Sequence, residues 1–337
     1  MELLVTGAWQ DAGNHIAELE ERGHRVYFLQ YEKDELPCSP DQIEGVICNG
    51  LFLYHAISEF TRLRYIQLTS AGYDRVPMDY IREHNIEIHN ARGVYSIPMA
   101  EYAIAGVLSL YKKLDVFREN QKQHKWEKQR DLLELYGKTV SIFGCGSVGC
   151  ECAKRFAAFG ARVIGVDIIF QEKVDFEKEV TSSEKNSRGI CASDERTANG
   201  NGKTAKIEEL QKAGFRVLFT IDDAITCLQQ SDIIISTLPL AQSTEHFFGK
   251  ECFEQMCDSS VFVNISRGGT VDTGALIQAI ANSEISGAVL DVFEEEPLQD
   301  TSPLWDFNNV IITPHNSFVG NGNQKRLSTV IMSNLRG

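Results

Sequence analysis

Short apolar runs bounded by glycine, asparagine or aspartate alternate along the chain with longer segments of helical periodicity. In roughly the first hundred residues the strand candidates are ELLVTG, GHRVYFL, IEGVICNG, LRYIQLTS and IEIHN. Alternation of strands with crossover helices is typical of a parallel sheet covered by helices. The pattern therefore predicts a small α/β unit of about five strands.

A second and longer series of the same kind begins at Lys138. Its strand candidates are KTVSIFG, ARVIGVD, FRVLFT, DIIISTLPL, SVFVNIS, SGAVLDVF and NVIITPH. They predict a larger, doubly wound parallel sheet of six or seven strands beside the smaller α/β unit. The length of 337 residues suits two domains, because one domain usually holds about 100 to 200 residues.

The segment between the two series, SIPMAEYAIAGVLSLYKKLDVFRENQ, predicts one helix. Pro98 is well placed in its first turn, and Gly106 is the only helix breaker in it. The first half is apolar nearly all round, so we expect burial on more than one side. A helix that crosses between domains or forms a dimer fits this pattern, and so does an ordinary core helix.

Residues 172–206 interrupt the second series with a polar segment. Fourteen of these 35 residues are charged and only eight are apolar, whereas 24% of the whole chain is charged. Such a segment buries too little apolar surface to offset the entropy lost when it becomes ordered. We therefore expect a mobile surface insertion.

Composition and charge exclude several classes of function. The net charge of −14 and the pI near 5.1 disfavour nucleic acid and anionic membranes as partners, because both favour clustered Lys and Arg. No apolar run reaches the roughly 18 residues of a membrane span, and the N-terminus lacks a signal-peptide pattern, so a cytoplasmic protein is expected. Nine scattered cysteines without CxxC spacing favour reduced thiols over a disulfide framework or a metal site.

A glycine-rich loop opens the second series. The run VSIFGCGSVGCECAKRFAAFGARVIGVD places Gly144, Gly146 and Gly149 between an apolar strand and a helix, and it ends with Asp167. The first glycine permits a tight turn, the second lets backbone approach a pyrophosphate at the helix N-terminus, and the third permits close packing. Asp167 suits a ribose diol and would repel a 2′-phosphate, which favours NAD over NADP. The alternative, a glycine-rich turn in another α/β fold, is disfavoured by Asp167.

Three later strand ends carry polar side chains. NISRGGTVD contains Arg267, LDVFEEEP contains Asp291 and Glu296, and ITPHNSF contains His315. In a doubly wound sheet such ends line the ligand crevice. Arg267 alone could satisfy turn carbonyls, the acidic run could be a solvated loop, and a single histidine is more often structural. Together they supply what hydride transfer to a keto acid needs: a cation for the carboxylate, an acid for the carbonyl oxygen and a partner that tunes the acid.

The motifs GCGSVG…D, STLPL, NISRGGTVD, LDVFEEEP and TPH, in this order, resemble the D-isomer-specific 2-hydroxyacid dehydrogenase family, and the resemblance covers nearly the whole chain. It implies a Rossmann-type NAD-binding domain at 98–316, which carries the insertion. It also implies a smaller flavodoxin-like substrate domain at 1–97 and 317–337, and a homodimer formed through the helix that includes Pro98.

The resemblance also implies roles for individual residues. His315 would be the acid in reduction and the base in oxidation, Glu296 would hydrogen-bond its imidazole, and Arg267 would bind the substrate carboxylate. The backbone amides of Ala71 and Gly72 would bind the same carboxylate. Cofactor contacts are implied for Gly144, Gly146, Ser147, Val148, Gly149, Asp167, Thr237, Leu238, Pro239, Ser266 and Asp291, the last at the nicotinamide carboxamide. No metal is expected.

The expected function is NAD-dependent interconversion of a 2-keto acid and a D-2-hydroxy acid, with the D configuration implied by the resemblance alone. A non-enzymatic NAD(H)-sensing interaction protein of the same fold is the alternative, because the family includes a corepressor branch. LFLYH at 51–55 and Tyr95 favour a small or apolar substrate side chain, although ordinary packing accounts for them equally well. Ser147, where the family often has Arg, and the run HNSFVGNGN depart from the family pattern.

Overall fold

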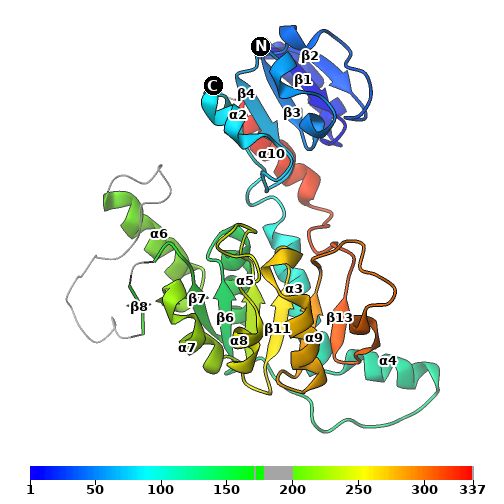
Figure 1. Cartoon of the computed structure of the whole chain (residues 1–337), viewed down its shortest axis with the longest axis vertical. Helices are drawn as coiled ribbons and strands as arrows, with labels where there is room; N and C mark the ends of the chain where they lie inside the picture. The colour runs from blue at the N-terminus through cyan, green and yellow to red at the C-terminus, as the bar shows by residue number, and fades with distance from the viewer. Residues whose placement is uncertain (171, 178–199, 336–337) are drawn as a thin grey trace. The chain divides into compact units, whose positions relative to one another are not determined.

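A computed structural model describes residues 1–170, 172–177 and 200–335 (Figure 1). The chain divides into two compact units. The smaller unit comprises Met1–Tyr95 and Val319–Gly337, and the larger comprises Ser96–Phe318. Among the described residues, no helix has both the length and the apolar character that crossing a membrane requires.

The smaller unit contains a five-stranded parallel sheet in the order β2-β1-β3-β4-β5. Its strands are β1 Glu2–Thr6, β2 Arg25–Leu29, β3 Gly45–Cys48, β4 Tyr65–Leu68 and β5 Glu87–His89. This strand order is that of flavodoxin-like folds. The five strands predicted for this part of the chain are confirmed.

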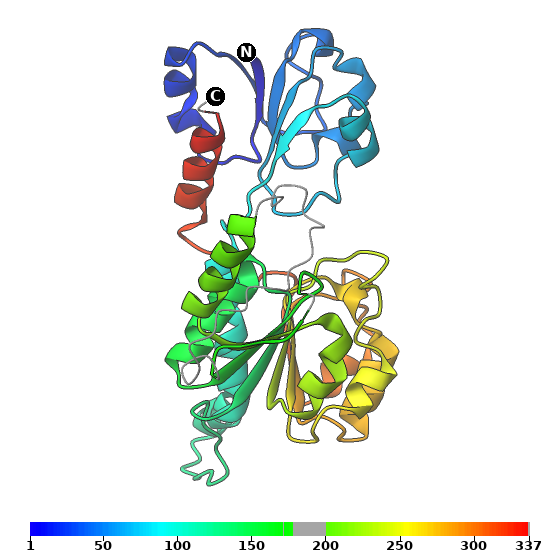
Figure 2. The same cartoon turned by 90° about the vertical axis from the view of Figure 1, so that its left-hand side faces the viewer.

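Helices cover both faces of this sheet. They are α1 Ile16–Glu21, α2 Met78–Glu83 and α10 Asn323–Asn334, with short 3₁₀ turns at Ala12–Asn14, Pro40–Gln42, Leu51–Leu53 and Ile57–Glu59. The C-terminal helix α10 returns to this unit and buries Leu327 and Ile331 in one core cluster with Leu3 and Trp9 (Figure 2). The indole of Trp9 also donates a hydrogen bond to Ser328 Oγ on α10 at 2.9 Å.

The larger unit contains an eight-stranded sheet in the order β13-β12-β11-β10-β6-β7-β9-β8. Its strands are β6 Thr139–Phe143, β7 Arg162–Val166, β8 Val174–Asp175, β9 Phe215–Phe219, β10 Ile233–Ser236, β11 Val261–Asn264, β12 Gly287–Leu290 and β13 Val310–Ile312. All neighbours are parallel except β8, which is antiparallel to β9. The order reverses between β6 and β10, so this is a doubly wound Rossmann-type sheet, as predicted.

Two helical layers cover the larger sheet (Figure 2). The helices are α3 Ser96–Tyr111, α4 Leu114–Lys122, α5 Ser147–Ala158, α6 Gly200–Lys212, α7 Ala224–Gln229, α8 Lys250–Glu254 and α9 Thr273–Ala281, with 3₁₀ turns at Ile221–Asp223, Gly268–Thr270 and Pro303–Asp306. Side chains of α3, α5 and α6 form one core cluster, and those of α7, α8 and α9 form the other. Helix α3 approaches β12 so closely that a Cβ on Gly106 would lie 2.5 Å from Val289 Cγ1.

The helix predicted as one element is two helices, and this part of the prediction was wrong. Helix α3 ends at Tyr111, and Lys113 adopts the left-handed conformation with φ of 50° before α4 begins. Lys112 Nζ donates to the Leu133 carbonyl at 2.6 Å, and Lys113 forms an ion pair with Asp131. Contacts with residues distant in the sequence therefore accompany the break, where the sequence has neither glycine nor proline.

The predicted insertion at 172–206 has regular structure at its two ends, where the sequence predicted a mobile segment. Strand β8 pairs with β9, and Phe176, which is buried, donates its N–H to the Arg216 carbonyl at 3.0 Å. Helix α6 begins at Gly200, still inside the predicted segment. A few apolar side chains suffice to order this part of the segment, because the edge of β9 supplies hydrogen-bond partners for its backbone. Residues 178–199 of the prediction lie outside the described residues.

Candidate active site

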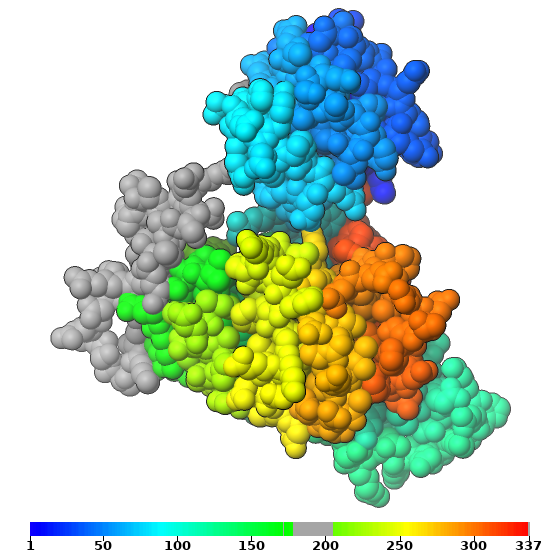
Figure 3. Space-filling model, in the orientation of Figure 1, coloured from blue at the N-terminus to red at the C-terminus, as the bar shows by residue number. Residues whose placement is uncertain are grey.

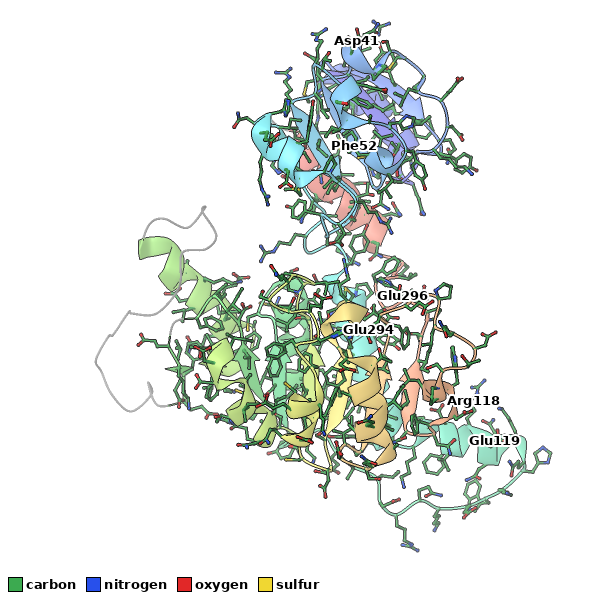
Figure 4. The ribbon with its side chains drawn as sticks, in the orientation of Figure 1. Asp41, Phe52, Arg118, Glu119, Glu294 and Glu296 are labelled. Carbon is green, nitrogen blue, oxygen red and sulfur yellow. The ribbon has the colours of Figure 1, made fainter. Side chains whose placement is uncertain are left out.

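Three candidate site residues predicted from the sequence lie just after the ends of three neighbouring strands of the larger unit. Arg267 follows β11, Asp291 follows β12 and His315 follows β13, and these strands are adjacent and parallel. The carboxyl ends of parallel strands meet at one edge of the sheet. Glu296, in the segment after β12, lies at this edge together with Glu294 (Figure 4).

His315 and Glu296 form a hydrogen-bonded pair at this edge. Nδ1 of the imidazole lies 2.8 Å from Oε2 of the carboxylate, and Oε1 accepts a hydrogen bond from Phe293 N at 3.0 Å. The side chains remain 41% and 36% exposed. A carboxylate on Nδ1 orients the ring and leaves Nε2 available for another partner, so the pair has the geometry of an acid/base and its orienting group.

The turn that carries His315 is held by Asp291. This aspartate has no exposed surface, and its carboxylate accepts hydrogen bonds from Asn316 N at 2.7 Å and Ser317 N at 2.9 Å. The backbone N–H of His315 donates to the Asp291 carbonyl at 2.8 Å. The structure thus gives Asp291 a place inside the turn, and a contact with the nicotinamide carboxamide stays a prediction for it.

Arg267 lies in a loop of short internal hydrogen bonds. Its carbonyl accepts from Thr270 Oγ1 at 2.7 Å and from Asn264 Nδ2 at 3.2 Å, while its Nη1 donates to the Ser266 carbonyl at 2.9 Å. Ser266 itself is buried, and its hydroxyl lies 2.8 Å from Asn264 Oδ1. Arg267 is partly exposed, and its guanidinium donates to one turn carbonyl.

A second histidine–carboxylate pair was missed in the sequence. His246 Nε2 lies 2.6 Å from Glu294 Oε1, and Glu294 Oε2 accepts from Thr273 N at 2.7 Å at the start of α9. Burial acts to raise the pKa of Glu294, but hydrogen bonds from Thr273 and His246 outweigh it and hold the pKa below its usual value. In the sequence, the acidic run that contains Glu294 has the character of a solvated loop. No local signal marks His246 as the partner of Glu294.

The three glycines of the glycine-rich loop have the surroundings predicted for them: Gly144 and Gly149 lie against other backbone, and Gly146 faces open space. Gly144 has φ of 97°, and a Cβ there would lie 2.7 Å from Thr237 Oγ1. A Cβ on Gly149 would lie 2.1 Å from the Gly144 carbonyl oxygen, so α5 meets the loop directly. A Cβ on Gly146, at the N-cap of α5, would meet nothing within 4 Å. That open space at an uncapped helix N-terminus fits a pyrophosphate.

Asp167 stands at the end of β7 beside this loop. Its Oδ2 accepts a hydrogen bond from Cys145 N at 2.6 Å, and its Oδ1 accepts one from Ile169 N at 3.2 Å. The side chain is partly exposed. Because each carboxylate oxygen has two lone pairs, each keeps one for a ribose hydroxyl. The loop and Asp167 together therefore offer suitable partners for a pyrophosphate and a ribose diol.

The remaining predicted contacts lie in two places. Thr237, Leu238 and Pro239 follow β10, next to the loop in the sheet order, and Thr237 Oγ1 donates to the Gly144 carbonyl at 2.8 Å. Ser147 and Val148 begin α5. Ala71 and Gly72 belong to the smaller unit, between β4 and α2, where the Ala71 carbonyl accepts from Asn90 Nδ2 at 2.7 Å. Their substrate role stays a prediction.

A cavity of about 540 Å³ lies beside the His315–Glu296 pair. Its other lining residues are mainly apolar and include Phe293, Leu298 and Trp305. The described residues that line it include neither lysine nor arginine. Among the residues that the structure describes, no group of three or more His, Cys, Asp or Glu side chains is arranged to hold a metal ion.

A dinucleotide loop, an acidic ribose partner and a histidine–carboxylate pair at one sheet edge define an NAD-linked oxidoreductase of the Rossmann type. Residues 104–193 and 201–317 match the family model described as D-isomer specific 2-hydroxyacid dehydrogenase, NAD binding domain. This match covers more than half of the 337 residues. The chain belongs to the D-isomer-specific 2-hydroxyacid dehydrogenase family.

Known proteins similar to the chain carry several substrate names. A glyoxylate reductase of Korarchaeum cryptofilum is 28% identical over 336 residues, covering 94% of this chain and 90% of that protein. A D-3-phosphoglycerate dehydrogenase of Methanocaldococcus jannaschii is 29% identical over 281 residues, or 83% of this chain, but the match spans only 46% of the relative's length. A D-isomer specific 2-hydroxyacid dehydrogenase family protein of Aeromonas salmonicida superposes with a TM-score of 0.71 at 26% identity, covering 99% and 94% of the two chains.

These matches confirm the predicted family, fold class, enzyme class and NAD cofactor. They give no support to the alternative of a sensing protein without activity. Which keto acid is used, and which residues act on it, is a separate question.

We expect Gly146→Ala to weaken NADH binding while leaving the melting temperature unchanged. The added methyl group meets no protein atom within 4 Å, but it would occupy the space through which backbone approaches the pyrophosphate. The dissociation constant, measured by NADH fluorescence titration, should rise about tenfold or more. Gly149→Ala is the control, because its methyl group collides with the Gly144 carbonyl and should lower the melting temperature. Wild-type affinity in Gly146→Ala would refute the pyrophosphate assignment.

We expect Glu294→Gln to destabilise the protein at neutral pH and much less in acid. A carboxyl whose pKa is lower in the folded state than its usual value of 4.5 stabilises the fold above that value. This stabilisation is lost as the pH falls through the folded pKa. The difference in melting temperature from wild type should therefore be largest near about pH 7 and shrink below pH 4.5. Glu295→Gln, in the same run, should show little difference; an equal effect in both variants would contradict the role of Glu294.

Proposed function

We propose that the protein interconverts a 2-keto acid and its D-2-hydroxy acid with NAD, using His315 as the acid/base. The observation that carries the proposal is the His315–Glu296 hydrogen bond of 2.8 Å at the sheet edge where β11 also presents Arg267. This edge belongs to the same sheet as the dinucleotide loop. The arrangement is suited to a substrate with adjacent carboxylate and carbonyl groups.

The chain's own groups account for the proton and for substrate orientation. In reduction, His315 Nε2–H would donate its proton to the carbonyl oxygen, and in oxidation the neutral ring would take the proton from the hydroxyl. Glu296 accepts the hydrogen bond of Nδ1 and so orients the ring, which leaves Nε2 to face the substrate. Arg267 would bind the carboxylate through two N–H groups, with the backbone amides of Ala71 and Gly72 as further donors. The bound nicotinamide supplies or accepts the hydride.

The cofactor would be held by the residues that follow β6, β7 and β10. Gly144, Gly146 and Gly149, with the N–H groups of Ser147 and Val148, would bind the pyrophosphate, and Asp167 would bind the adenosine ribose. Thr237–Pro239 and Ser266 are proposed to line the nucleotide, and Asp291 is proposed to bind the nicotinamide carboxamide. On this proposal the larger unit is the cofactor domain and the smaller unit the substrate domain.

We propose a substrate with a small or apolar side chain. The cavity beside His315 and Glu296 is lined mainly by apolar groups, and the described residues that line it include neither lysine nor arginine. A phosphorylated substrate would require lysine or arginine partners for its phosphate. The names of the relatives, which include glyoxylate reductase and D-3-phosphoglycerate dehydrogenase, span both kinds of substrate. The apolar lining of the cavity supports a substrate with a small or apolar side chain over a phosphorylated one.

We also propose a homodimer formed through α3 and the segment that follows it. Helix α4 and the residues up to Tyr136 project from the body of the larger unit (Figures 1 and 3). The apolar side chains exposed on this segment are Leu114, Val116, Trp126, Leu132, Leu133 and Tyr136, with Trp126 96% exposed. Contiguous exposed apolar groups of this kind mark protein interfaces.

NADH oxidation with a panel of keto acids tests the catalytic proposal. Glyoxylate, pyruvate, hydroxypyruvate and a branched keto acid should be reduced faster than phosphohydroxypyruvate. His315→Gln should lower kcat by about a hundredfold or more, because general acid catalysis contributes on that order, while NADH binding stays near that of wild type. Arg267→Ala should mainly raise KM for the keto acid.

Three outcomes would overturn parts of this proposal. Full turnover in His315→Gln would remove its acid/base role, and an unchanged KM in Arg267→Ala would remove its role in carboxylate binding. Tight NADH binding without reduction of any panel member would favour a sensing function.

The dimer is tested by analytical ultracentrifugation. We expect the wild-type protein to sediment at about twice 37.7 kDa, and Trp126→Ala combined with Leu133→Ala to shift it toward the monomer, because buried apolar area drives such association. Tyr31→Ala removes an exposed aromatic group of the smaller unit and should leave the mass unchanged. A monomeric wild-type protein at micromolar concentration would contradict the proposal.

A further inference from the structure

A chain of hydrogen bonds links α3 to the turn that carries His315. Tyr102 Oη lies 2.6 Å from Thr313 Oγ1, and Thr313 Oγ1 lies 2.6 Å from Asp291 Oδ1. A threonine hydroxyl has one proton, and an ionised carboxylate only accepts. Thr313 therefore donates to Asp291, and Tyr102 donates to Thr313. Burial raises the pKa of Tyr102, which keeps its phenol protonated as this direction requires.

This series of hydrogen bonds ends at the turn that carries His315. Oδ1 of Asp291 accepts from both Thr313 and Asn316 N, and Oδ2 accepts from Ser317 N. Three donors thus converge on one carboxylate, which is fully buried. Any displacement of Thr313 changes the hydrogen bonding of the same oxygen that holds the residue following His315.

His315 needs such support because of its backbone conformation. Its φ is 50°, in the left-handed region that side chains other than glycine rarely adopt. Residues held there persist only where the surroundings fix them, because the conformation costs free energy. Helix α3 is a rigid anchor for this purpose, since its Gly106 leaves no room between the helix and Val289 of β12.

We propose that Tyr102 is a positioning residue for the acid/base. Its hydroxyl, acting through Thr313, holds the Asp291-centred turn so that His315 stays aligned on Glu296. This inference rests on the proposed function of His315, and it assigns to α3 a role in catalysis beyond packing.

A second tyrosine on the same helix shows that burial alone does not require this contact. Tyr111 is buried in the core cluster against which the partly buried Tyr102 packs, yet the Tyr111 hydroxyl has no hydrogen-bond partner among the described residues. The two tyrosines therefore offer a matched comparison: each loses one hydroxyl on replacement by phenylalanine, and only one hydroxyl is linked to the turn.

The test is a double-mutant cycle on Tyr102→Phe and Thr313→Val, with Tyr111→Phe as control. Tyr102→Phe should lower kcat by about two- to tenfold, the range of one hydrogen bond, with KM and NADH affinity little changed. In the Thr313→Val background the same substitution should have no further effect, because the phenol has already lost its partner. Tyr111→Phe should leave kcat at the wild-type value.

Amide hydrogen exchange of the cofactor-free protein gives a readout independent of turnover. The N–H groups of Asn316 and Ser317 donate to Asp291, so they should exchange about two- to tenfold faster in Tyr102→Phe and at the wild-type rate in Tyr111→Phe. A merely structural role would lower the melting temperature without this local change.

The positioning role is overturned if Tyr102→Phe retains wild-type kcat or if Tyr111→Phe lowers kcat by as much. It is also overturned if the fall in kcat caused by Tyr102→Phe is as large in the Thr313→Val background as in the wild type. Full turnover in His315→Gln would instead defeat the proposed function. The exchange rates then still report whether Tyr102 holds the turn, so the two failures are distinguishable.

Discussion

The buried carboxylate of Asp291 is the interaction on which the candidate site depends. A carboxylate without exposed surface is stable only when hydrogen bonds replace its lost hydration, and here Thr313, Asn316 and Ser317 supply them. Asp291 follows β12, which lies between β11 and β13 in the sheet. Because its partners come from the segment after β13, the sheet edge and the turn with His315 form one polar unit. Breaking that unit would leave a charge buried without partners, which opposes any opening of the turn.

Close backbone approach fixes the neighbouring loop in a similar way. A Cβ on Gly268 would lie 1.8 Å from the Phe293 carbonyl carbon, so no side chain separates the loop after β11 from the segment after β12. Arg267 precedes this contact and Glu296 follows it. Glu294 strengthens the junction by bonding both His246 and the first turn of α9. This backbone contact thus sets how far apart the loop segments that carry Arg267 and Glu296 lie.

Sequence reasoning reached the strands, the glycine loop and the strand-end residues because each has a local signal. Apolar runs mark β6 and β11, and three glycines at fixed spacing mark the turn before α5. The left-handed Lys113, the strand β8 and the Thr313–Asp291 bond have no such signal. Asp291 and Thr313 are 22 positions apart, and His246 and Glu294 are 48 apart, so these pairs exist only once the sheet order is known. Apart from the His315–Glu296 pair, which the family resemblance implies, the long-range polar contacts are the part of the site that the sequence leaves undetermined.

The two histidine–carboxylate pairs show why proximity alone does not identify an acid/base. Both are short, at 2.8 Å and 2.6 Å, and both are partly exposed. They differ in what holds them. His315 directly follows a strand next to β12, and its backbone is bonded to Asp291. His246 lies well beyond the end of β10, and its carboxylate partner is also bonded to the N-terminus of a helix. The first arrangement presents a ring nitrogen at the sheet edge, as the proposed acid/base role requires, while the second joins two loops.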